Sequence, residues 1–207
     1  MAGFWTKIAD YFTYYKQKEV QRIAISGGPG TGKTCLIDHL VDKGYHCFPE
    51  IIRTFTEQLK KETAQEEQQI NPLTFSKDPL HFNTLLLEGR SAQWKEAENT
   101  GEELCFFDRS VIDVLGYMDH FEQEYPNHFI ETAKTLRYDT VFLLPPWKDI
   151  YVQDDQRLEP FEEAERIHES LLASYHHFDY APILVLTGTI EERIEFLLKA
   201  IAAKEKK

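Results

Sequence analysis

The residues Gly27–Thr34, with the sequence GGPGTGKT, match the phosphate-binding pattern G-x-x-x-x-G-K-[ST] at every fixed position. Glycines allow a tight turn whose backbone N–H groups point inward, where they can hold phosphate beside the N-terminus of a following helix. We expect Lys33 to reach the β- and γ-phosphates and Thr34 to coordinate a bridging Mg²⁺ ion. The predicted nucleotide-binding residues are Gly27, Gly28, Pro29, Gly30, Thr31, Gly32, Lys33, Thr34 and Cys35.

A second candidate group, Asp108-Arg109-Ser110, follows the hydrophobic run Leu104–Phe107. An acidic residue at the end of a strand downstream of such a loop holds Mg²⁺ and its waters, so Asp108 is predicted to bind the metal together with Thr34. Motor ATPases usually place a glutamate next, which activates the attacking water, whereas this chain has Arg109. An arginine suits charge stabilisation or acceptor binding, and a structural salt bridge is the alternative. The triplet therefore favours phosphoryl transfer over hydrolysis.

Glu50 and Arg157 complete the predicted catalytic set. Glu50 follows a short strand and is a candidate general base for a substrate hydroxyl, because ligands of open parallel sheets bind beyond the strand C-termini. The alternative is a helix-start glutamate that the helix dipole favours. Arg157 follows two aspartates in a predicted lid and would close over the phosphates, whereas a pair with Glu162 accounts for Arg166. The predicted catalytic residues are Lys33, Glu50, Asp108, Arg109 and Arg157.

The elements that must position these residues are five short hydrophobic runs that alternate with helical patterns. They predict a three-layer α/β domain around a five-stranded parallel sheet. The expected strands are 22–26, 45–49, 104–107, 140–144 and 182–186. A long helix is expected to begin at Pro79, after Asp78, and helices over 111–124 and 127–136 should follow the third strand. The apolar face of the long helix is expected to comprise Phe82, Leu85, Leu86, Trp94 and Ala97, with Arg90 in a surface ion pair.

Residues 1–20 precede the first strand and carry aromatic and aliphatic side chains at helical spacing. This pattern predicts an amphipathic helix. The stripe comprises Phe4, Trp5, Ile8, Tyr11, Phe12 and Tyr15. We expect it to pack on the domain or on a second subunit, and a membrane-surface helix formed by residues 1–18 is the alternative. Residues 21–207 are then one P-loop domain, with a lid at about 148–166.

Composition narrows the function further. The chain has 207 residues, of which 42% are hydrophobic and 28% charged, as in a soluble globular protein. A net charge of −12 argues against nucleic acid as the main partner. An odd number of cysteines without metal-ligand spacing or a secretion signal predicts reduced thiols in the cytoplasm. His168, His176 and His177 lack a metal-binding pattern and are expected on a helix surface.

The segments GGPGTGKT, FFDRS, YDTVFLLPPW, DDQR and FEEAERIHESLL resemble the NadR-type AAA domain family, P-loop proteins related to the nicotinamide riboside kinase module of NadR. The resemblance covers nearly the whole chain after residue 20. It implies a fold like that of nucleoside and nucleotide kinases, an arginine-bearing lid, ATP or GTP with Mg²⁺, and kinase activity on a riboside. Related animal proteins resemble GTP- and lipid-binding trafficking factors.

Two functional hypotheses follow. The first is a kinase that transfers the γ-phosphate of Mg-ATP to a hydroxyl of a nucleoside-like small molecule. ATP is favoured over GTP because the chain lacks the N-K-x-D motif that recognises guanine. The second is a nucleotide-hydrolysing switch that binds a protein or lipid partner through the N-terminal helix. The pocket side chains come from scattered helices, so the sequence specifies neither the acceptor nor an oligomeric state.

Overall fold

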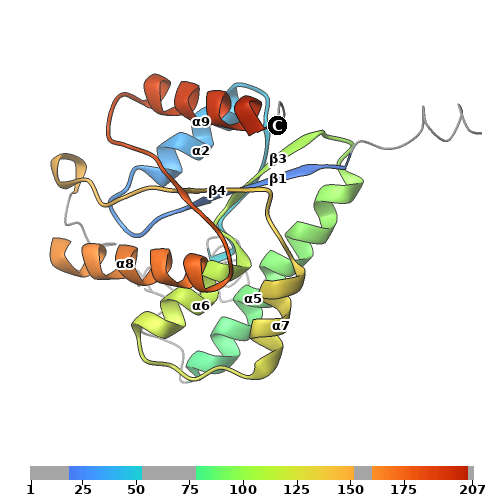
Figure 1. Cartoon of the computed structure of the whole chain (residues 1–207), viewed down its shortest axis with the longest axis vertical. Helices are drawn as coiled ribbons and strands as arrows, with labels where there is room; N and C mark the ends of the chain where they lie inside the picture. Colours follow the sequence, from blue (N-terminus) through green and yellow to red (C-terminus); the bar gives the residue numbers. More distant parts are fainter. Residues whose placement is uncertain (1–18, 53–77, 152–159, 205–207) are drawn as a thin grey trace, which may run out of the picture.

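The computed structural model describes residues 19–52, 78–151 and 160–204. The predicted helix over residues 1–18 and the candidate Arg157 lie outside these ranges, so both stay predictions. Five parallel strands form one sheet in the order β2-β3-β1-β4-β5 (Figure 1), which confirms the predicted architecture. The strands are β1 (Gln21–Ser26), β2 (His46–Phe48), β3 (Leu104–Asp108), β4 (Thr140–Leu143) and β5 (Ile183–Leu184).

The helices of the described ranges connect these strands. They are α2 (Lys33–Asp42), α5 (Pro79–Glu96), α6 (Val111–His120), α7 (Asn127–Thr135), α8 (Phe161–His177) and α9 (Ile190–Lys204), with 3-10 turns η1 (Ala97–Asn99) and η2 (Lys148–Ile150). Several elements are shorter than predicted, most clearly α6 and β5. α6 ends at His120, and Glu122 just beyond it has a φ of 53°, which an α-helix does not accommodate. β5 pairs with β4 over only two residues, Ile183 and Leu184.

Alternating side chains divide the core into two layers. Ile23 and Phe142 belong to a cluster with residues of α2 and α9, whereas Ala24 and Val141 belong to a cluster with residues of α5, α6 and α7. This alternation follows from the two-residue period of a strand. Figure 1 shows α2 and α9 on one side of the sheet and α5 to α8 on the other. No helix of the described ranges has the length and apolar character needed to span a membrane.

Parallel pairing brings the candidate site residues together at the carboxyl ends of the strands. The phosphate loop follows β1, Glu50 follows β2, and Arg109 follows β3. β1 lies between β3 and β4, with Ile25 opposite Asp108 in the register of β1 and β3. Ligands of such sheets bind beyond the carboxyl ends of the strands where the strand order reverses. The fold therefore places these candidate residues around one possible binding site.

α5 buries a partly polar face. Its side chains Asn83, Arg90 and Gln93 are buried beside Leu86, whereas Leu85 is exposed. The prediction that Leu85 belongs to the apolar face was therefore wrong. Polar side chains are rarely buried without partners or a function. This face of α5 thus adds polar groups to the protein interior close to β2 and α6.

A fully buried carboxylate, that of Asp113 in α6, connects three elements. Its Oδ1 accepts a hydrogen bond of 2.5 Å from Ser26 at the end of β1. Its Oδ2 accepts from the backbone N–H of Ser110 at 2.8 Å and from the Tyr175 hydroxyl of α8 at 2.6 Å. The Ser110 side chain in turn accepts from the Ile112 N–H at 3.0 Å, which completes a capping box. This network fixes the entry to the phosphate loop relative to α6 and α8.

Replacing Asp113 with alanine should lower the free energy of unfolding by about 3–5 kcal/mol, because several buried donors lose their acceptor. Urea denaturation followed by circular dichroism measures this change. The matched control is Asp119→Ala in the same helix. Asp119 is exposed and accepts hydrogen bonds from Ser174 and Tyr125, so its loss should cost only about 1 kcal/mol. Equal losses in the two variants would contradict the structural role given to Asp113.

Candidate active site

The loop between β1 and α2 has the geometry of a phosphate cradle. Gly30 and Gly32 have φ values of 70° and 74°, in the left-handed region that glycine adopts without strain. A β-carbon at Gly27 would lie 2.8 Å from the Leu144 carbonyl oxygen, so larger residues do not fit there. Gly32 is the N-cap of α2 and supplies no side chain to the first turn. The N–H groups of that turn are therefore suited to an anionic ligand.

Lys33 and Asp108 form a buried ion pair between Nζ and Oδ1. Lys33 is the first residue of α2, and Asp108 is the last residue of β3. The structure therefore brings together two residues predicted to act on the phosphates and the metal, with Thr34 next to Lys33 in the chain. One hydroxyl and one carboxylate, completed by phosphate oxygens and water, match the ligands that Mg²⁺ prefers. Within the described ranges, no group of three or more His, Cys, Asp and Glu residues is placed to hold a metal ion without the nucleotide.

Glu50 is held between two arginines. Its Oε1 accepts from Arg90 Nη2 of α5 at 3.0 Å, and its Oε2 is ion-paired with Arg109 Nε. Arg90 Nη1 also donates to the Ser110 carbonyl at 2.9 Å. The predicted ion pair of Arg90 thus exists, but it is buried and not at the surface, which corrects the sequence interpretation. Because Arg90 touches both Glu50 and Ser110, it holds the segment after β2 against the segment after β3.

The arginines determine the charge of Glu50. Burial alone would raise the pKa of this carboxyl group, but the positive charges of Arg109 and Arg90 outweigh that effect and lower the pKa from 4.5 to about 2. Glu50 is therefore an anion at neutral pH. Its low pKa makes it a weak base in the ground state, and a carboxylate of this kind can accept a hydrogen bond from a hydroxyl and orient it.

Arg109 combines an unusual backbone conformation with a guanidinium group that is not fully hydrogen-bonded. Its φ of 76° is a left-handed conformation that non-glycine residues adopt only when their surroundings enforce it. Its guanidinium lies 5.0 Å from the Tyr117 ring centre, and its Nη1 lies 3.6 Å from Asp113 Oδ1. Nη1 makes no hydrogen bond, although it is buried beside the Asp113 carboxylate. The guanidinium therefore keeps one N–H group that the protein does not fully satisfy.

Three further residues contribute less to the site. Trp147, after β4, donates its backbone N–H to the Gly30 carbonyl at 3.3 Å, so it contacts the phosphate loop directly. Arg166 is exposed and pairs with Glu163, three residues before it, and not with Glu162 as predicted. His168 is half-buried, with its Nδ1 buried and unpaired, so the prediction of a surface position was only partly right.

Sequence reasoning missed the partners of two polar side chains that lie on distant helices. Asn83 of α5 donates from Nδ2 to Gln123 Oε1 at 2.9 Å. Arg193 of α9 donates from Nη2 to the Thr31 carbonyl of the phosphate loop at 3.0 Å. The polar residues Asn83, Arg90 and Gln93, three and seven positions apart, could have indicated a buried polar face of α5. For Arg193 the sequence holds no comparable signal.

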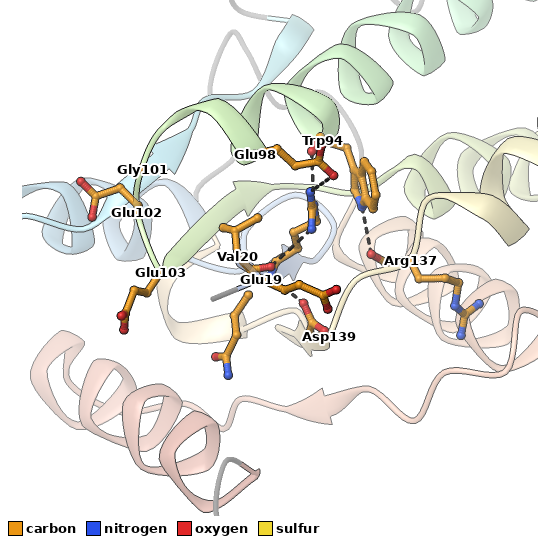
Figure 2. Close-up of a pocket in the computed structure, with 11 residues that line it drawn as sticks. Glu19, Val20, Trp94, Glu98, Gly101, Glu102, Glu103, Arg137 and Asp139 are labelled. Carbon is orange, nitrogen blue, oxygen red and sulfur yellow. Dashed lines mark hydrogen bonds and ion pairs between the residues drawn. The ribbon is translucent and has the colours of Figure 1, made fainter. Parts of the chain in front are cut away.

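A cavity of about 850 Å³ lies at the amino-terminal ends of the strands, at the end of the sheet away from the phosphate loop. It is lined by the first residue of β1, Gln21, and by Glu103 and Asp139, which immediately precede β3 and β4. Figure 2 shows several carboxylates around it, including those of Glu98 and Glu102. Carboxylates repel phosphate, and the phosphate loop lies at the other ends of the same strands. This cavity is therefore not the nucleotide site.

Comparison with known sequences places the chain in a family. A family described as an AAA domain matches residues 22–193, which is most of the chain. The chain belongs to this AAA domain family. The match confirms the family resemblance that the sequence motifs indicated. No curated protein matches the sequence.

Solved structures with related folds are nucleoside and nucleotide kinases and NadR. Deoxyadenosine kinase from M. mycoides, with the products dCMP and dCDP bound, is 20% identical, with a TM-score of 0.60 over 88% of this AAA domain and 100% of that chain. Thymidylate kinase from Candida albicans is 15% identical, with a TM-score of 0.63 over 90% of this chain and 92% of that chain. NadR in complex with NAD and AMP-PNP is 15% identical, with a TM-score of 0.63 over 94% of this chain. The AAA domain spans only 56% of that NadR chain.

The low pKa of Glu50 predicts a characteristic loss of stability in acid. The folded pKa of about 2 lies below the usual 4.5, so the charged form adds stability that is present above about pH 4.5 and is lost as the pH falls towards 2. Glu50→Gln should cost about 3 kcal/mol at pH 7, because two arginines lose their counter-charge, and should lose less stability than the wild type on acidification. Urea unfolding at pH 7, 5 and 3.5 measures both effects.

The control is Glu195→Gln, which removes an exposed carboxylate paired with Lys199. Solvent screens this pair, so the variant should follow the wild type closely at each pH. A Glu50→Gln variant with the acid sensitivity of the wild type would contradict the ion-pair account.

Proposed function

We propose that this AAA domain is a kinase that transfers the γ-phosphoryl group of Mg-ATP to a hydroxyl of a nucleoside-like small molecule. The observation that carries the proposal is the position of Arg109. It follows Asp108 beside the phosphate loop and is held by Glu50, which comes from the end of the neighbouring strand. An arginine and an ionised glutamate beyond the phosphate site suit the binding of an acceptor.

The donor side of the proposed site consists of the phosphate loop, Lys33, Thr34 and Asp108. The loop N–H groups hold the phosphates, and Lys33 turns from Asp108 towards the β- and γ-phosphates when nucleotide binds. Thr34 and Asp108 would hold Mg²⁺, which neutralises charge that develops between the β- and γ-phosphates. These residues act by position and charge, because phosphoryl transfer requires little covalent chemistry from the protein.

The acceptor side consists of Glu50 and Arg109, with the buried polar face of α5 nearby. Glu50 accepts a hydrogen bond from the acceptor hydroxyl and takes its proton late in the reaction, when the hydroxyl has become acidic through bonding to phosphorus. Arg109 would place the positive charge of its guanidinium near an oxygen of the acceptor or of the transferred phosphoryl group. Arg157 in the predicted lid would supply a further positive charge over the phosphates.

Two arguments support a nucleoside-like acceptor. The related folds include a deoxyadenosine kinase, a thymidylate kinase and a NadR protein in complex with NR. The amide side chains of Asn83 and Gln123 form a partly buried hydrogen-bonded pair, and such groups would offer donors and acceptors to the edge of a base or a carboxamide if the acceptor reaches them. The ligands named here belong to those related proteins. For this chain we propose only the class of acceptor, a nucleoside-like molecule.

The proposal predicts ADP formation that depends on the acceptor. Purified protein with Mg-ATP should release ADP only slowly alone, and at least about 10²-fold faster with one member of a panel of ribonucleosides, deoxynucleosides and nicotinamide riboside. A coupled ADP assay measures the rate, and parallel reactions with GTP identify the preferred donor. Equal rates with and without every acceptor would contradict the kinase proposal and would support the nucleotide-hydrolysing switch.

Replacing Arg109 with glutamine should separate catalysis from nucleotide binding. We expect kcat to fall by about 10²–10³-fold, because a charge directed at the transition state is lost, while the Kd for Mg-ATP changes less than about threefold. Calorimetry gives the Kd, and the ADP assay gives kcat. The control is Arg137→Gln, because Arg137 is exposed and lies just before β4, at the end of the strand away from the phosphate loop. If Arg109→Gln kept its kcat, the assigned role of Arg109 would be wrong.

A further inference from the structure

Arg193 lies against the phosphate loop. It stands in the first turn of α9, where Thr189 and Glu192 cap the helix: the Thr189 N–H donates to Glu192 Oε2 at 2.9 Å, and the Glu192 N–H donates to Thr189 Oγ1 at 3.3 Å. The side chain is 5% exposed. Nη2 donates to the Thr31 carbonyl at 3.0 Å, and Nη1 lies 2.8 Å from the point where a β-carbon of Gly32 would stand. Arg193 therefore contacts the loop at the peptide that joins Thr31 to Gly32.

The charge of Arg193 has no carboxylate partner within the described ranges. The other arginines held in the interior there are ion-paired: Arg22 with Glu98, Arg90 with Glu50, and Arg109 with Glu50 and Asp113. Arg193 forms no such pair, its Nε is buried without a hydrogen bond, and burial lowers its pKa. The Thr31 carbonyl and the Trp147 ring, whose centre lies 6.0 Å from the guanidinium carbon, offset part of this charge but supply no counter-ion. A negatively charged ligand would supply one. The position of Arg193 beside a phosphate site indicates what that ligand is.

Peptide geometry connects Arg193 to the ligand. The chain contains no cis peptide among the described residues, and in a trans peptide the C=O and N–H bonds point in opposite directions. Because the Thr31 carbonyl points at Arg193, the N–H of Gly32 in the same peptide points away from Arg193. A cation on the carbonyl polarises the peptide and makes that N–H a stronger donor.

We infer that Arg193 is a positioning residue of the phosphate cradle, which fixes the Thr31–Gly32 peptide for phosphate binding and has the polyphosphate of the bound nucleotide as its counter-charge. The inference rests on the proposed nucleotide-binding function and adds to it a residue of the last helix. The relevant ligand class is a nucleoside triphosphate or a free polyphosphate. A nucleoside monophosphate carries less charge and should depend less on Arg193.

The test compares Arg193→Lys, Arg193→Gln and Arg193→Met in the full chain. Calorimetry measures Kd for Mg-ATP, for inorganic triphosphate with Mg²⁺ and for AMP, at low and high salt. We expect Arg193→Lys to bind Mg-ATP within about fivefold of the wild type. The neutral variants should bind Mg-ATP and triphosphate about 10- to 100-fold more weakly, as expected when a charged hydrogen bond is lost. The loss of affinity for AMP in the neutral variants should be smaller. Their affinity for triphosphate should depend less on salt concentration than that of the wild type.

Arg22→Met is the matched control. Arg22 is also buried, but it pairs with Glu98 at 3.1 Å and lies 3.8 Å from the Trp94 ring centre, at the start of β1 (Figure 2 labels both partners). This variant should lose thermal stability without nucleotide and keep the wild-type Kd for Mg-ATP. Arg193→Met should show the reverse, with a melting temperature above that of Arg22→Met and a weakened Kd.

The outcomes separate the inference from the proposed function. If the wild type binds Mg-ATP and the neutral variants bind it equally well, the role of Arg193 is overturned while the nucleotide site stands. If the wild type binds neither Mg-ATP nor triphosphate, both are overturned. Should Arg193→Met fail to fold, the other two variants decide, because equal affinity of the lysine and glutamine variants would overturn the claim that the charge matters.

Discussion

The carboxylate of Asp113 is fully buried, and both of its oxygens are occupied by donors from β1, α6 and α8. A buried charge is tolerated only while its lone pairs are satisfied, so these three elements cannot move independently. The phosphate loop begins one residue after Ser26, and Arg109 immediately precedes Ser110. The donor and acceptor sides of the proposed site therefore take their relative position from one buried charge.

Charge balance then explains how a protein with a net charge of −12 could bind an anionic substrate. Glu50 neutralises part of the charge of two arginines, and Asp108 neutralises Lys33. Arg193 adds a positive charge without a carboxylate partner in the described ranges, and the glycine loop adds oriented N–H dipoles. The net charge of these residues around the phosphate loop is therefore positive although the chain as a whole is acidic. Nearby charges act on a ligand more strongly than distant, solvent-screened charges do.

The sequence predicted most of the fold and a candidate phosphate loop. The P-loop is a contiguous motif whose residue types follow directly from its geometry, and the hydrophobic runs before Ser26 and Asp108 predicted the parallel sheet. The sequence did not predict Arg193 or the buried position of Arg90, because their partners lie far away along the chain and depend on how α9 and α5 pack. Leu85 was misplaced because α5 buries polar residues, which disturbs the apolar periodicity on which the prediction relied.

The fate of the γ-phosphorus tests the central claim most directly. In a single turnover with excess enzyme, ATP and the best acceptor of the nucleoside panel, ³¹P NMR distinguishes a phosphate ester from inorganic phosphate. If Arg109 and Glu50 bind a hydroxyl beside the phosphate loop, as proposed, most of the γ-phosphorus should appear as the ester of the acceptor. Quantitative release of inorganic phosphate in the presence of every acceptor would contradict it and would identify the protein as a hydrolase.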